Sequence, residues 1–119
     1  MIENFSVDKT NLYWTVDAKE VSLHIEGLDQ AMHDDHRQKV IMLCNAQPLP
    51  DKLLVLDEDG SEALSFFPPD GAAFYYLTKN EINEVLVVCV FHEKLGGWYD
   101  WHFSIDIKNK KLIKNSPAY

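Results

Sequence analysis

The stretch "EVLVVCVFH", residues 84 to 92, lies at the centre of the fold predicted for this 119-residue chain. Nearly every position in it is apolar, so side chains on both faces of an extended strand need cover. Alternation sends Val85, Val87, Cys89 and Phe91 to one face, and Leu86, Val88 and Val90 to the other. We therefore expect a central strand with packed structure on one side and further sheet or a partner chain on the other.

The segment that follows, "GGWYDWHFSID" (96–106), carries the candidate binding residues. Its glycine pair indicates a turn, after which alternation directs Tyr99, Trp101, Phe103, Ile105 and Ile107 into the core. The opposite face then presents Trp98, Asp100 and His102 in a row. His92, at the end of the preceding strand, is expected near Asp100 or Trp98 if the two strands pair through the turn. These four residues form a candidate recognition surface.

Alternating apolar residues and turn signals predict strands over most of the remaining chain. Two hairpins are expected, followed by a single strand and a short closing strand near the C-terminal end of the sequence. The predicted strands cover residues 11–16 and 20–26 for the first hairpin, 52–57 and 61–67 for the second, then 72–78, and finally 112–114.

Residues 29 to 44 are predicted to form the one helix. Asp29 suits the N-cap position, Asn45 suits the position after the C-cap, and "PLP" (48–50) forbids continuation. The run "VIMLC" (40–44) is apolar all round, and periodicity does not separate a buried helix from a buried strand over five residues. A short helix followed by a strand is therefore the alternative.

The expected fold class is α+β, with residues 1–119 forming a single α+β domain. A curved, mainly antiparallel sheet of six to eight strands receives one helix, inserted after the first hairpin and packed on its inner face. A half-closed barrel or cup around the helix fits the same pattern.

The stretch "HDDHR" (33–37) contains the remaining candidate site residues. On a helix, Asp35 and His36 would share the stripe of the apolar residues and form a partly buried, charge-bearing pair, a pattern typical of functional sites. Two imidazoles and a carboxylate also resemble metal ligands, but the spacing matches no helical zinc motif. We predict neither a metal site nor a cofactor.

Charge and cysteine content indicate the class of partner and the compartment. Residues 1 to 107 hold nineteen acidic and seven basic side chains, a net charge of −12, which disfavours nucleic acid and anionic membranes as partners and favours a basic protein. Cys44 and Cys89 lie in apolar runs, as reduced core thiols do. No secretion signal precedes them, so we expect a cytoplasmic protein.

No nucleophile elbow, phosphate loop or other catalytic motif is present in the sequence. We therefore expect a small, acidic, soluble, non-enzymatic interaction protein. It binds a protein partner, in the manner of an inhibitor of a basic toxin or nuclease, and self-associates as a homodimer through its apolar sheet. The alternative is a small-molecule-binding cup or enzyme in which Asp35, His36, His92 and His102 converge between helix and sheet.

Overall fold

The computed structural model describes residues 1–118, and over these residues the chain consists of β-strands and their connections, without a helix. Eleven strands follow one another along the chain. They are β1 (Ile2–Asp8), β2 (Asn11–Val16), β3 (Lys19–His24), β4 (Leu28–Asp34), β5 (Lys39–Cys44), β6 (Lys52–Leu56), β7 (Glu62–Phe66), β8 (Ala72–Lys79), β9 (Val85–Leu95), β10 (Trp98–Asp106) and β11 (Lys111–Pro117).

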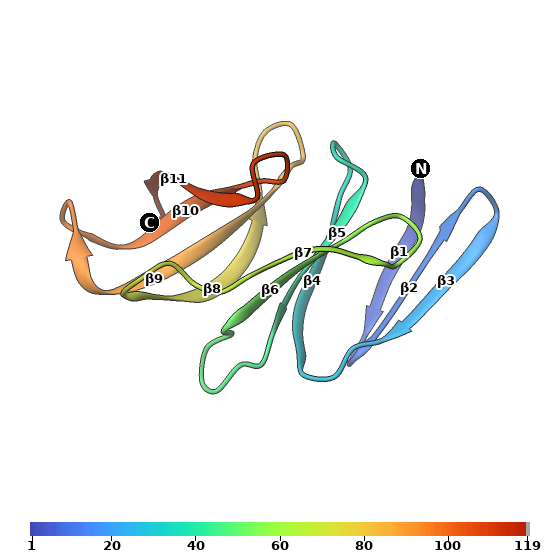
Figure 1. Cartoon of the computed structure of the whole chain (residues 1–119), viewed down its shortest axis with the longest axis horizontal. Coiled ribbons are helices and arrows are strands. Elements are labelled where there is room, and N and C mark those ends of the chain that lie inside the picture. Colours follow the sequence, from blue (N-terminus) through green and yellow to red (C-terminus); the bar gives the residue numbers. More distant parts are fainter. Residues whose placement is uncertain (119) are drawn as a thin grey trace.

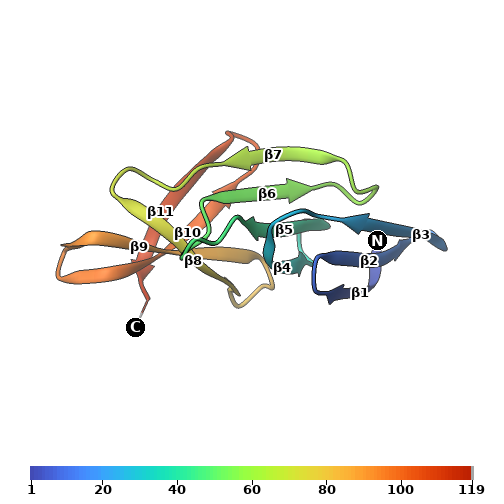
Figure 2. The same cartoon turned by 90° about the horizontal axis from the view of Figure 1, so that it is seen from below.

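The strands form three separate antiparallel sheets, each built in chain order. Sheet A contains β1 to β3, sheet B contains β4 to β7, and sheet C contains β8 to β11. Within each sheet, every strand pairs with the next one along the chain, because short turns can join only antiparallel strands. The sheets succeed one another along the 48 Å long axis of the molecule (Figure 1), and the turned view keeps sheet B between the other two (Figure 2).

The predicted α+β class is therefore wrong, and so is the single curved sheet of six to eight strands. Residues 29–44, expected to be a helix, form the β4–β5 hairpin. Asn45, interpreted as a helix end, instead leaves β5 with a positive φ of 63°. The alternative of a strand over residues 40–44 is confirmed, although no helix precedes it.

Strand β5 is apolar all round because sheet B is the middle layer of a stack of three. Ile41 and Leu43 belong to the hydrophobic cluster shared with sheet C. Val40 and Met42, which alternate with them, belong to the cluster shared with sheet A. A strand that faces packed sheets on both sides has no solvent face, so the usual apolar–polar alternation is lost.

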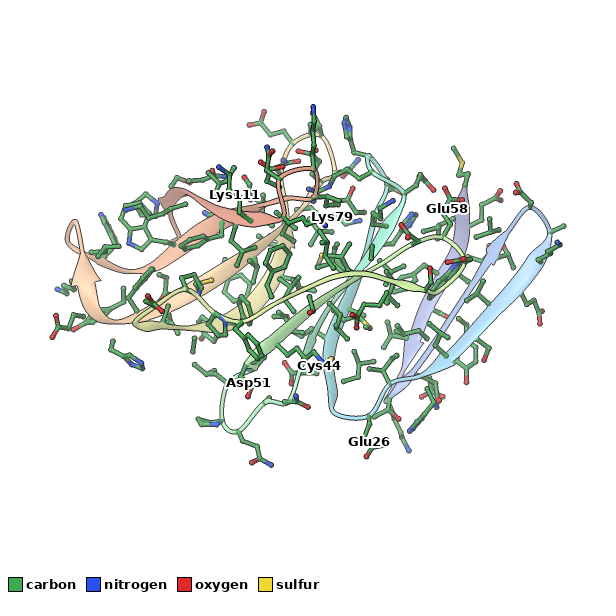
Figure 3. The ribbon with its side chains drawn as sticks, viewed as in Figure 1. Glu26, Cys44, Asp51, Glu58, Lys79 and Lys111 are labelled. Atoms are coloured by element: carbon green, nitrogen blue, oxygen red, sulfur yellow. The ribbon has the colours of Figure 1, made fainter. Side chains whose placement is uncertain are left out.

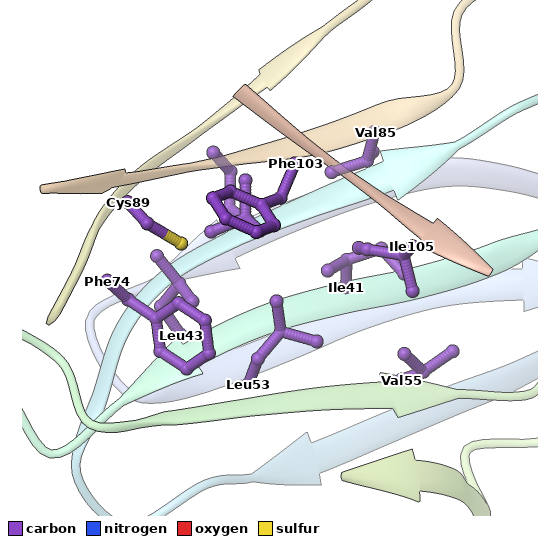
Figure 4. Packing of buried hydrophobic residues seen from close by; sticks show 11 residues of the cluster. Ile41, Leu43, Leu53, Val55, Phe74, Val85, Cys89, Phe103 and Ile105 are labelled. Atoms are coloured by element: carbon purple, nitrogen blue, oxygen red, sulfur yellow. The ribbon is translucent and has the colours of Figure 1, made fainter. Parts of the chain in front are cut away.

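The core between sheets B and C consists of large side chains that meet face to face (Figure 4). Leu53 and Val55 from sheet B lie opposite Phe74, Cys89 and Phe103 from sheet C, and all are buried. Burying one such side chain contributes about 1.5–3 kcal/mol. This cluster therefore supplies much of the stability that joins the two sheets.

Sheet A covers the opposite face of sheet B through a second cluster. Leu12 and Trp14 of β2 are fully buried in it. The indole Nε1 of Trp14 donates a hydrogen bond of 2.7 Å to the carbonyl oxygen of Glu58, in the β6–β7 turn. The buried indole thus satisfies its polar atom and ties sheet A to sheet B.

A buried ion pair joins sheet B to sheet C at the end of β4. The Asp34 side chain has no solvent exposure, and its Oδ2 lies 2.6 Å from an amino nitrogen of the Arg37 guanidinium. The same oxygen accepts a hydrogen bond of 2.9 Å from the backbone nitrogen of Val85 in β9. Arg37 also donates to the carbonyl oxygens of Val85 and Ile105, so every partner of the pair is satisfied within the protein.

Gln30 forms a second polar link between the same sheets. Its side-chain amide donates to the carbonyl oxygen of Tyr75 at 3.0 Å and accepts from the backbone nitrogen of Leu77 at 2.9 Å. The side chain thus pairs with β8 as a neighbouring strand would. Together with Asp34 and Arg37, it fixes how sheet C sits on sheet B.

His33 has an imidazole that the fold holds away from water. Its Nδ1 lies 3.2 Å from Asp35 Oδ1, its ring packs 6.1 Å from the ring of Phe5, and its Nε2 is buried without a hydrogen-bond partner among the described residues. Burial lowers the pKa of His33 below 6.5 and outweighs the opposing attraction of the Asp35 carboxylate.

This lowered pKa predicts a loss of stability in mild acid. Below pH 6.5 the unfolded chain takes up a proton at His33 that the folded chain resists, so the free energy of unfolding falls as pH decreases. Chemical denaturation at a series of pH values measures the slope, which we expect to be shallower in the His33→Gln variant. His24→Gln, the same substitution at an exposed histidine, is the matched control; equal slopes in the wild type and in His33→Gln would contradict the prediction.

Several predictions from the sequence are confirmed. The first predicted hairpin is observed as β2–β3, although the unpredicted strand β1 precedes it and pairs with β2. The second predicted hairpin is observed as β6–β7. The stretch 85–91 forms the first part of β9, which pairs with strands on both sides. Phe103 and Ile105 are buried as expected, whereas Tyr99 is 48% exposed and lies outside the core. The predicted core face therefore begins at Trp101 rather than at Tyr99.

Candidate functional site

The candidate site is the face of sheet C that points away from sheet B, called here the outer face. Directly paired residues of neighbouring strands share a face, so the register defines its members. They form three rows across the sheet. The rows are Thr78, Leu86, Ser104 and Ile113; Tyr76, Val88 and His102; and Ala73, Val90 and Asp100.

Apolar side chains occupy the middle of this face. Val88 has no solvent exposure, although no other sheet covers it, and its row neighbours Tyr76 and His102 flank it on either side. Leu86 and Val90 are half-buried. Tyr76 and Ile113 remain 38% and 39% exposed. The outer face is thus an apolar strip whose polar groups stand at its margins.

The corresponding outward face of sheet A has a different composition. Its members alternate with the buried residues of β2 and β3, and they are Asn11, Tyr13, Thr15, Glu20, Ser22 and His24. Apart from Tyr13, which is 40% exposed, all are polar or charged. The stack therefore ends in a solvated surface at sheet A and in an apolar surface at sheet C.

Polar groups from β10 and β11 border the apolar strip. The Oγ of Ser116 lies 3.4 Å from His102 Nδ1, and the Asn115 amide donates to the Ser104 hydroxyl. His102 and Ser116 also line a shallow pocket of about 480 Å³, together with residues of the β8–β9 connection. No carboxylate is hydrogen-bonded to His102 among residues 1–118, so the described residues do not complete a Ser–His–carboxylate arrangement around this pair.

The structure brings two of the predicted site residues together. Asp100 and His102 both lie on the outer face, in adjacent rows. Trp98 was expected beside them, but the register shifts between Trp98 and Asp100, and Trp98 pairs with Leu95 near the tip of the hairpin. The predicted row of three is therefore interrupted, and Trp98 lies beyond the end of the face.

The other predicted site residues lie elsewhere. His92 is on β9, two residues beyond the Val90 that pairs with Asp100 and four beyond the Val88 that pairs with His102, or about 7 Å and about 13 Å along the strand. Asp35 and His36 lie in the β4–β5 turn, where Asp35 contacts His33 and His36 Nε2 is 3.9 Å from Glu84 Oε2. The predicted convergence of these groups with His102 in a cup is not observed.

Thiols and metal ligands contribute no further site in the described part of the chain. Cys44 and Cys89 are free and buried in different clusters. Burial raises the pKa of both thiols, that of Cys89 to about 12, so neither forms a thiolate near neutral pH. Residues 1–118 contain no group of three or more histidine, cysteine or acidic side chains arranged to hold a metal ion.

A pocket of about 740 Å³ lies away from the outer face of sheet C. It opens where β4 begins and β5 ends, and its polar lining comes from Asp29, Asn45, Gln47 and Asp51. None of the predicted site residues lines it. The Asp29 carboxylate already accepts a hydrogen bond from Gln30, and the pocket holds no buried unpaired polar group that points to a ligand.

Sequence reasoning missed Tyr76, Ile113 and Ser116. A register shift between Phe74 and Tyr76 sends Phe74 into the core and Tyr76 outward, although residues two apart normally share a face. Strand β11 extends to Pro117, beyond the predicted 112–114, and this extension brings Ser116 to His102. The unbroken apolar run of β9 was the one signal in the sequence that pointed to this face.

These features define an all-β protein of three antiparallel meanders packed face to face, with one apolar terminal face. The described part of the chain contains no helix with the length and apolar character of a membrane span. Comparison with protein-family models, with curated proteins and with solved structures gives no match for this chain. Its function is therefore inferred from its own geometry.

Proposed function

We propose that this protein is a non-enzymatic interaction module that binds another protein through the outer face of sheet C. The partner presents an apolar surface of nearly neutral charge and covers the half-buried Leu86 and Val90 and the exposed Tyr76 and Ile113. Asp100 and His102 at the margin provide hydrogen bonds that orient it. The two buried free thiols fit a reducing compartment, and we place the protein in the cytoplasm.

The observation that supports this proposal most strongly is the difference between the two ends of the stack. Both end sheets have one face packed on sheet B, yet only sheet C has a strand, β9, whose side chains on the other face are all aliphatic over residues 85–91, namely Leu86, Val88 and Val90. Where one face of a sheet is solvated, apolar and polar residues normally alternate along its strands, as they do in β2 and β3. An apolar face at the surface is typical of a protein contact site.

Charge favours a second candidate function, the binding of a basic protein, at the other end of the molecule. Residues 1–66, which form sheets A and B, carry thirteen acidic and five basic side chains, a net charge of −8. Glu26 and Glu58 lie at this end, whereas Lys79 and Lys111 belong to sheet C (Figure 3). Binding there would weaken steeply with added salt, and burial of the apolar face would not.

Site-specific photo-crosslinking in cells tests the proposal. Tyr76 and Tyr13 are almost equally exposed, but they lie on the outward faces of sheets C and A. Replacing each in turn with the photo-reactive amino acid p-benzoylphenylalanine gives a matched pair. We expect a discrete adduct of higher mass from position 76 and none from position 13, because only sheet C is covered by a partner. Adducts from position 13 alone, or from neither position, would overturn the proposal.

A further inference from the structure

We infer that the partner is a second copy of this chain, which packs its own outer face of sheet C against the first. This inference rests on the proposed function, because it uses the same face. The face is apolar at its centre and carries both donors and acceptors at its margin, namely His102, Ser116 and Asp100. Such a surface is complementary to itself, as the interface of a two-fold dimer must be.

The charge distribution favours a second copy over a strongly charged partner. Residues 72–117, which contain sheet C, carry five acidic and six basic side chains, a net charge of +1. Two such sheets meet without appreciable repulsion. The −8 of sheets A and B then lies at the two far ends of the assembly, since the sheets follow one another along the 48 Å axis. Apposing any acidic part of the two copies would be costly.

The architecture already contains the required packing mode twice. Sheet A packs on sheet B through one apolar cluster, and sheet B packs on sheet C through another. Stacked sheets lie about 10 Å apart, with interdigitated side chains. A second copy on sheet C would repeat this contact with Leu86, Val90 and Tyr76, giving a continuous stack of six sheets.

The size of the face predicts a reversible dimer. Four strands about 4.8 Å apart, averaging about nine residues at about 3.3 Å each, cover roughly 550 Å². Two copies would therefore bury about 1,100 Å², close to the lower limit of about 1,200 Å² for standard interfaces. We expect the dimer to be populated at micromolar and higher concentrations and to dissociate on dilution.

Sedimentation equilibrium of the full chain, over a range from low micromolar to millimolar protein, tests this inference. We expect the mass to rise from 13.7 kDa to twice that value. Tyr76→Asp places an unpaired charge in the interface, on the strand beside Val88, and should abolish dimerisation. Tyr13→Asp makes the same change at an equally exposed tyrosine of sheet A and should leave it intact. Because both side chains are partly exposed, both variants are expected to fold, and circular dichroism verifies this.

The outcomes separate this inference from the proposed function. A wild-type chain that stays monomeric at millimolar concentration, or equal dimerisation of the two variants, would overturn the second copy as partner. If the crosslinked adduct of position 76 then has a mass other than twice that of the chain, another protein binds the face and the proposed function stands. If no adduct forms at position 76, both proposals fail.

Discussion

Replacing Asp34 with alanine is expected to lower the free energy of unfolding by about 3–5 kcal/mol, the range for removing one partner of a buried ion pair. The substitution leaves the Arg37 guanidinium, only partly exposed, without its carboxylate. It also leaves the buried backbone nitrogen of Val85 without an acceptor. Both lost contacts lie where sheet B meets sheet C, so the damage falls on the junction between layers.

Two further variants isolate the cause of this effect in urea denaturation. Asp35→Ala removes the neighbouring carboxylate, which is largely exposed, and should cost less than about 1 kcal/mol. The double replacement Asp34→Leu with Arg37→Met removes both charges at once. It should lower the free energy of unfolding by less than Asp34→Ala does, because no unpaired charge stays buried. A loss below about 1 kcal/mol for Asp34→Ala would contradict the assigned role.

The second large effect is expected at two adjacent residues of β5. Ile41→Ala and Met42→Ala should each cost about 2–5 kcal/mol, the range for truncating a fully buried aliphatic side chain. Ile41 packs toward sheet C and Met42 toward sheet A, and both are fully buried. Neighbouring residues with equally large costs indicate a strand covered on both faces.

A pair on β2 provides the contrast for this experiment. Trp14 is buried, while Tyr13, its neighbour, is 40% exposed on the outward face of sheet A. Trp14→Ala should cost about 3–5 kcal/mol, whereas Tyr13→Ala should fall near the small effects typical of surface positions. If only one of Ile41→Ala and Met42→Ala lowers the free energy of unfolding strongly, as expected for the β2 pair, sheet B is not a middle layer.

Local patterns predicted most hairpins but not the number of layers. Alternation over residues 11–16 and the turn at residues 58–60 are local signals, and both lead to the observed strands. The run 40–44 carries no period of two, because its strand faces two apolar layers. An all-apolar run of five residues fits a buried helix as well as a buried strand. Asp29 and Asn45, which resemble helix-capping residues, then favoured the helix, which is wrong. The packing of sheets A and C on the two faces of β5 decides that this run is a strand, and this packing cannot be seen in a short stretch of sequence.

The candidate site was predictable in outline and not in detail. The two-sided apolar character of β9 predicted packed structure on one face, which sheet B provides, and Asp100 and His102 lie on the other face. Register shifts next to Trp98 and Tyr76 then changed which side chains share that face. Such irregularities depend on pairing with a neighbouring strand, so strict alternation within one strand does not reveal them.

The most direct test of the central claim is a dilution series of backbone amide NMR spectra from the full chain. If the outer face of sheet C is the contact surface, chemical shifts that change with concentration will cluster on Tyr76, Val88 and His102 and their row neighbours, while Tyr13 and the rest of sheet A stay constant. Changes confined to sheet A, or none up to millimolar protein together with no crosslink at position 76, would contradict it.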